Sequence, residues 1–180
     1  LRTIRSVLTA QGQPLQRYEL EVEQRFTSAD IYVLTHAMQE TVRSGTGKSA
    51  TRWLSPDLHL AGKTGTSDDQ RDSWFAGFSG NYLGVVWMGI DDNQPTPLTG
   101  ATGALPVWAN TMAALPQIPL QAAQPENIDW VWIDPQQQAR TAAHCDNALY
   151  LPLRKDTVPA EQVSYGAGGR VLNWFKKWIR

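Results

Sequence analysis

The sequence has little net charge and few charged residues. Asp and Glu number 17 against 16 Lys and Arg, and charged residues make up 18% of the chain. Nucleic-acid-binding domains usually carry a clustered basic excess, so this balance argues against a nucleic-acid partner. No apolar run reaches the roughly 20 residues that span a bilayer. There is no signal peptide, and because the chain opens at Leu1 directly in strand-like sequence, we expect further polypeptide to precede it.

Cysteine is nearly absent. Cys145 is the single cysteine, which excludes an internal disulfide but does not settle the redox compartment. His144 lies directly beside it, and metal ligands usually have intervening residues, so we predict no metal site. At 42% hydrophobic residues, including eight tryptophans, the chain can still bury a core.

Apolar periodicity and turn residues predict an α+β fold. Thr27 and Asp30 have capping-box spacing before a helix over Ser28–Ser44, which Gly45 and Gly47 end. A small hairpin, or a strand with a return segment, is expected before it, over residues 3–14. After it we expect strands over 58–66, 74–78 and 82–90 and a helix over 101–114 with Val107, Trp108 and Met112 on its buried side. The third strand is almost continuously apolar, which predicts burial on both faces. This order gives an antiparallel sheet flanked by helices.

The composition changes after Pro116. Residues 116–170 are rich in Pro, Gln and Ala, with a strand expected at Trp130–Ile133. Residues 170–180 form an amphipathic pattern that suits either a membrane or partner surface or docking on the protein itself. We therefore divide the chain into 1–115 and a C-terminal extension, 116–180.

The most informative segment is Lys63-Thr64-Gly65-Thr66, followed by Ser67. Lys-Thr-Gly is one of three motifs of penicillin-sensitive acyl-transfer sites, and Ser-x-x-Lys and Ser-x-Asn are the others. Neither precedes Lys63 in this chain. Ser79-Gly80-Asn81 matches the letters of the third motif, but it follows Lys63 and reads as a turn between two strands. The segment would thus belong to an active site whose nucleophile lies outside these residues.

Four further segments, in the same order, resemble the class A bifunctional penicillin-binding proteins, most of all the type 1b members of Gram-negative bacteria. They are Gly45-Thr46-Gly47, Asp72–Gly77, Val86–Asn93 and Thr99–Trp108. The resemblance covers residues 1–115 well and the rest weakly. It implies part of a penicillin-binding transpeptidase or serine β-lactamase-like fold, with residues 1–115 as the C-terminal portion of the transpeptidase domain.

The resemblance also implies roles for the motif residues. Lys63 would support the electrostatics of the site, and the hydroxyls of Thr64 and Thr66 would hold the carboxylate of substrate or drug. The backbone N–H of Thr66 would donate to the oxyanion. Gly65 would let another backbone approach, since it has no side chain, and Ser67 would supply a further hydroxyl.

For the whole protein, the resemblance implies peptidoglycan synthesis by two activities. A glycosyltransferase would polymerise lipid II, and a DD-transpeptidase would cross-link stem peptides through a serine acyl-enzyme that β-lactams block. The transpeptidase would need no cofactor, and a divalent metal is left open for the glycosyltransferase. The protein would lie on the periplasmic side of the inner membrane, anchored by a helix outside this chain. Its partners would be the rest of its own polypeptide, an outer-membrane lipoprotein activator and cell-division proteins.

Two alternatives use the same motifs. A serine β-lactamase or DD-carboxypeptidase would transfer the acyl group to water, and a β-lactam sensor domain would be acylated without turnover. By itself this chain is expected to be inactive, because it lacks the nucleophile.

Overall fold

The computed structural model describes residues 4–19, 23–160 and 162. It begins with the expected hairpin, in which β1 (Ser6–Leu8) pairs antiparallel with β2 (Pro14–Arg17). Both strands are exposed along their length. The hairpin is therefore held by its own backbone ladder and contributes nothing to the core.

The first helix, α1 (Ser28–Arg43), has nearly the predicted limits. Thr27 is its N-cap, with Oγ1 accepting from the Asp30 backbone N–H at 3.2 Å. The Thr27 hydroxyl in turn donates to the Asp30 carboxylate at 2.7 Å. The cap spacing in the sequence was thus sufficient to locate the start of the helix.

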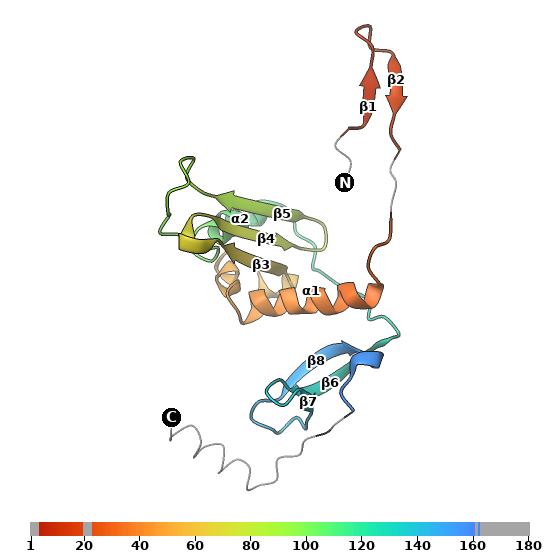
Figure 1. Cartoon of the computed structure of the whole chain (residues 1–180), viewed down its shortest axis with the longest axis vertical. Helices are drawn as coiled ribbons and strands as arrows, with labels where there is room; N and C mark the ends of the chain where they lie inside the picture. The colour runs from red at the N-terminus through yellow and green to blue at the C-terminus, as the bar shows by residue number, and fades with distance from the viewer. Residues whose placement is uncertain (1–3, 20–22, 161, 163–180) are drawn as a thin grey trace.

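The central sheet has the order β3-β4-β5 and is antiparallel throughout, as predicted (Figure 1). Its strands are β3 (Ala61–Thr66), β4 (Ser73–Phe78) and β5 (Leu83–Met88). α1 packs along β3, and α2 (Ala104–Ala113) packs across β4 and β5. Short 3₁₀ helices at Lys48–Arg52, Pro56–Leu58 and Asp68–Gln70 connect these elements.

The core joins the sheet and α2 to the end of α1 and the segment that follows it. Trp108 is 1% exposed and its ring centroid lies 4.8 Å from that of Phe75. Gly77 and Gly84 make room for this indole, since an added Cβ on either would lie 2.9 Å from a Trp108 ring atom. Two glycines on neighbouring strands thus form the recess that receives the largest buried side chain of α2.

Three predictions about these elements are wrong in part. The motif strand begins at Ala61 rather than at Leu58, because residues 56–58 form a 3₁₀ helix and His59 adopts a left-handed conformation. β5 is not buried on both faces: Leu83, Val85 and Trp87 are exposed, since within the described residues α2 covers one face only. Val107 is 45% exposed, because the buried side of α2 is formed by residues 104, 105, 108, 109 and 112.

A second three-stranded sheet follows residue 116, with the order β7-β6-β8. Its strands are β6 (Ile128–Asp134), which contains the predicted strand, β7 (Ala139–Arg140) and β8 (Leu149–Arg154). A 3₁₀ helix over Lys155–Thr157 comes next. The predicted amphipathic segment, 170–180, lies outside the described residues, and the division of the chain near residue 115 stays a prediction.

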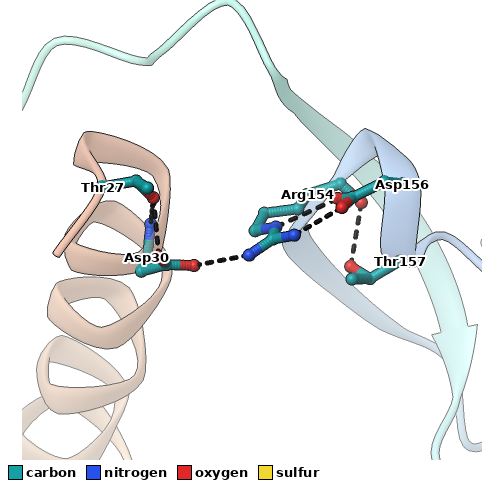
Figure 2. A network of polar contacts seen from close by, with 5 residues as sticks. All are labelled: Thr27, Asp30, Arg154, Asp156 and Thr157. Atoms are coloured by element: carbon teal, nitrogen blue, oxygen red, sulfur yellow. Dashed lines mark hydrogen bonds and ion pairs between the residues drawn. The ribbon is translucent and has the colours of Figure 1, made fainter.

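Arg154 joins this second sheet to α1 (Figure 2). Its guanidinium donates to Asp30 at 3.0 Å, next to the Thr27 cap, and it also binds Asp156 through two nitrogens. The hydrogen bonds to Asp156 and then Asp30 hold the Arg154 pKa above its ordinary value. Thr27 first, and Arg154 second, hold the pKa of Asp30 below its usual range. Residues 124 positions apart therefore share one network of charges.

Candidate functional site

The predicted motif occupies the outer half of an edge strand. Within the described part of the chain, β3 pairs with β4 alone. Ala61 and Gly62 are buried, whereas Lys63 and Thr66 are exposed and Thr64 and Gly65 are half-buried. The strand therefore leaves the core between Gly62 and Lys63, and its motif half is partly open to solvent.

Lys63 carries its charge at the surface of this strand. Its Nζ donates to the backbone carbonyl of Thr64 at 2.7 Å. The Lys63 side chain is thus folded onto the backbone of its own strand. An ammonium has three donors, so two remain for a ligand.

The Thr64 hydroxyl is held from the end of α1. Its Oγ1 lies 2.8 Å from Oγ1 of Thr46, and either oxygen can be the donor. Thr46 belongs to the loop of residues 44–47 that follows the helix. The loop and the motif strand are thereby joined by a direct contact between side chains.

The Thr66 hydroxyl is held from the segment before α2. The backbone N–H of Gly100 donates to Thr66 Oγ1 at 3.0 Å. Gly100 can approach this closely because it lacks a side chain: an added Cβ would lie 2.5 Å from the Trp74 carbonyl oxygen and 2.6 Å from that of Gly65. The glycine is therefore required by space as well as by the hydrogen bond.

Gly65 also lies in a place where a side chain would not fit well. A Cβ there would lie 3.1 Å from Cβ of Trp74, which is the residue opposite on β4. Trp74 is 44% exposed, and its ring centroid lies 6.2 Å from that of Trp87. The missing side chain thus allows β3 to lie close against Trp74.

Ser67 and Asp72 close the loop after the motif. Ser67 Oγ accepts from the Asp72 N–H at 2.8 Å, and the Ser67 N–H donates to the Asp72 carbonyl at 3.1 Å. Trp87 Nε1 donates to the half-buried Asp72 carboxylate at 2.8 Å. This bond first, and Ser67 second, hold the pKa of Asp72 below its usual range. Asp72 thus organises the loop, and the Ser67 hydroxyl is engaged in that loop.

The structure places the four motif residues, Lys63, Thr64, Gly65 and Thr66, on one strand. Ser67 lies next to them at the start of the loop. The structure adds Thr46 and Gly100, which the sequence did not place at the site. Both lie in segments that carry the family resemblance, and this was the available signal. No group of three or more potential metal ligands occurs among the residues described.

A cavity of about 780 Å³ lies elsewhere, between α1 and the second sheet. Trp130 and Tyr150 form one side, and His36 stands edge-on to Trp130 with ring centroids 4.8 Å apart. Burial is the main reason that the pKa of His36 lies below its usual value. None of residues 63–67 lines this cavity, so its size does not make it the acyl-transfer site.

Comparison with known proteins gives relatives over most of the chain. Penicillin-binding protein 1B of Vibrio cholerae is 38% identical over 177 residues, which is 98% of this chain and 22% of that protein. The proteins of the same name from Escherichia coli and Haemophilus influenzae are each 37% identical over 134 residues, or 74% of this chain and 16% and 17% of theirs. The chain thus spans about a fifth of the length of these relatives.

The fold has a counterpart among solved structures. The crystal structure of penicillin-binding protein 1A from Haemophilus influenzae superposes with a TM-score of 0.62 at 17% identity, over 89% of this chain and 30% of that one. This likeness confirms the predicted α+β fold class. No family model matches the chain. No helix of the described residues is both long enough and apolar enough to cross a membrane.

Proposed function

This chain belongs to the penicillin-binding protein 1B family, and from that premise we propose that β3 is the substrate-binding wall of a peptidoglycan DD-transpeptidase. The protein of which it is part would cross-link stem peptides through a serine acyl-enzyme. The attacking serine, its Ser-x-x-Lys lysine and the Ser-x-Asn pair would come from polypeptide outside these residues.

One observation carries the proposal. The motif half of β3 is a partly exposed edge that carries the Lys63 ammonium and the hydroxyls of Thr64 and Thr66, and each hydroxyl has a hydrogen-bond partner from another segment of the fold. A carboxylate accepts hydrogen bonds and cannot donate them. A cation with two oriented hydroxyls is therefore suited to hold the carboxylate at the end of a D-Ala-D-Ala peptide or on a β-lactam.

The chemistry follows from this placement. An extended peptide can add as a strand beside β3, with affinity from main-chain hydrogen bonds. The serine oxygen would attack the carbonyl of the penultimate D-alanine, and the Thr66 N–H would be one donor to the resulting oxyanion. Loss of the last D-alanine as a free amine then gives the acyl-enzyme, which an amine of a neighbouring stem peptide resolves to form the new amide bond.

The remaining parts of the prediction rest on the family. A glycosyltransferase in the same protein would supply the glycan strands that carry these stem peptides. The protein would act on the periplasmic side of the inner membrane, held by an anchor elsewhere in its polypeptide. β-Lactams would acylate the same serine and remain bound.

The test is acylation of the whole protein by labelled penicillin. We expect Lys63→Ala to slow acylation by about two to four orders of magnitude, as the loss of a charge-stabilising group often does. Lys155→Ala, which removes an exposed lysine of the 3₁₀ helix after β8, is the matched control and should leave the rate unchanged. Equal rates for Lys63→Ala and the parent protein would remove Lys63 from the site.

Turnover separates this function from its alternatives. With a stem-peptide donor and an amine acceptor, a transpeptidase forms the cross-linked product. Hydrolysis of the donor even with abundant amine would identify a carboxypeptidase or β-lactamase. Acylation by penicillin with no turnover of any peptide would identify a sensor domain.

A further inference from the structure

We infer that Thr46 is a positioning residue of this site: its hydroxyl donates to Thr64 Oγ1 and thereby directs the Thr64 proton outward, toward the carboxylate of the ligand. The inference rests on the proposed function of β3 and deepens it. It concerns how the site prefers an anionic ligand terminus over a neutral one.

The contact between the two hydroxyls is the first observation. Thr46 Oγ1 lies 2.8 Å from Thr64 Oγ1, a normal distance for a hydrogen bond between hydroxyls. Each hydroxyl has one proton, so only one of the two can donate in this pair. If Thr64 donates to a ligand carboxylate, then Thr46 must be the donor between them.

The loop that carries Thr46 is fixed in place. Gly45 N–H donates to the Glu40 carbonyl at 3.2 Å, and Gly47 N–H donates to the Thr41 carbonyl at 2.9 Å. A Cβ on Gly45 or Gly47 would lie 3.0 or 3.1 Å from that Thr41 oxygen, so the two glycines allow the loop to fold tightly onto the end of α1. Thr46 is consequently presented to β3 by a backbone that is anchored on both sides of it.

The Thr66 hydroxyl, like that of Thr64 in this arrangement, accepts a hydrogen bond from the protein. Thr66 Oγ1 accepts from the Gly100 N–H, which can only donate. The Thr66 proton is therefore free to point to a ligand acceptor. With Thr46 as donor to Thr64, both motif hydroxyls become outward donors, and this arrangement matches a carboxylate better than a carboxamide.

The experiment compares two forms of one penicillin on the whole protein, the free carboxylate and its carboxamide. Thr46→Val removes the hydroxyl from an exposed position with little change of shape, and Thr46→Ser restores it. We expect Thr46→Val to slow acylation by the carboxylate form about 3- to 10-fold, the effect of one uncharged hydrogen bond. The carboxamide should react at nearly the parent rate, and Thr46→Ser should recover most of the loss.

Thr51→Val is the matched control, since the Thr51 hydroxyl is also near α1 but donates to the Lys48 carbonyl at 2.8 Å. It should change neither rate. In the double variant Thr46→Val/Thr64→Val the loss should equal that of Thr64→Val alone, because Thr46 acts only through Thr64.

Three results would overturn the inference: an unchanged carboxylate rate in Thr46→Val, an equal loss for carboxylate and carboxamide, or additive losses in the double variant. The proposed function fails separately, and would do so if the parent protein were not acylated or if Lys63→Ala were acylated at the parent rate. Normal acylation of the parent with a defect in Thr64→Val but none in Thr46→Val refutes the role of Thr46 alone.

Discussion

Asp72 is the residue whose charge state the structure ties most clearly to the geometry beside the motif. Trp87 Nε1 donates to its carboxylate, and this bond is the main reason that its pKa is lowered in the folded protein. A carboxyl with a depressed folded-state pKa contributes stability above its unfolded value of about 3.9 and loses that contribution as the pH falls through the folded value.

We therefore expect Asp72→Asn to lower the apparent melting temperature of the whole protein between pH 5 and pH 7, by about 1–3 °C for a partly exposed hydrogen bond. The difference from the parent should shrink below about pH 4, because protonated Asp72 resembles the amide. Melting curves from pH 3 to pH 7 measure this. In a Trp87→Phe background, which lacks the indole donor, Asp72→Asn should have less effect, and a pH-independent difference in both backgrounds would contradict the assignment.

Also at the scale of residues, the sequence identified the motif residues but not the residues that contact them in space. Lys63, Thr64 and Thr66 are consecutive, so a local pattern identifies them. Thr46 is 18 positions from Thr64, and Gly100 is 34 positions from Thr66. These pairs meet only because α1 packs along β3 and the segment before α2 folds onto β3 and β4, and no local spacing encodes such contacts.

At the scale of single elements, Trp108 is the largest buried side chain that packs α2 against the sheet. The indole fills the recess left by Gly77 and Gly84 and contacts Phe75. Trp108→Leu should destabilise the folded state by about 2–4 kcal/mol, because it leaves a cavity in that recess. Val107→Ala on the exposed side of the same helix should change stability by no more than about 0.5 kcal/mol.

Denaturant unfolding of the two variants, followed by tryptophan fluorescence, measures this difference. Since Trp108 itself contributes to the signal, circular dichroism should be recorded in parallel. Similar midpoints for Trp108→Leu and Val107→Ala would show that α2 is held by contacts other than this indole.

The errors in predicting these elements have physical causes. The limits of α1 were readable because a cap and two glycines mark them locally. The apolar residues of β5 predict burial on both faces. An apolar residue prefers a buried position, but the sequence does not show which segment of polypeptide covers it. Val107 and Trp108 cannot both lie at the centre of the buried side, since one step along a helix turns a side chain by roughly 100°.

At the scale of the whole molecule, the second sheet is connected to the first part of the chain through Arg154. Its partners are Asp30 at the start of α1 and Asp156 in the following 3₁₀ helix (Figure 2). His36 of α1 also contacts Trp130 of β6. The sequence predicted both α1 and the strand at 130–133, but it could not predict that α1 meets the second sheet, because contacts across such distances, including the ion pair across 124 positions, have no local signature.

Arg154→Met tests whether this network holds the second sheet against α1. Methionine keeps much of the apolar stem but loses the charge and every hydrogen bond of the guanidinium. We expect backbone amides of β6 and β8 to exchange hydrogen about 2- to 5-fold faster in the whole protein, the range for loss of partly exposed ion pairs. Raising the salt concentration should accelerate exchange in the parent toward the variant's rate, because the attraction between these charges is screened.

Arg25→Met provides the matched control, since the ion pair of Arg25 among the described residues is with Glu23, two positions away, and both side chains are 71% exposed. It should leave exchange in β6 and β8 unchanged. If Arg154→Met also left it unchanged, with the parent insensitive to salt, the contact between His36 and Trp130 and the neighbouring apolar packing would be sufficient to hold the sheet. We expect the network to hold the sheet, because Arg154 engages two carboxylates at once and one of them is already oriented by the Thr27 cap.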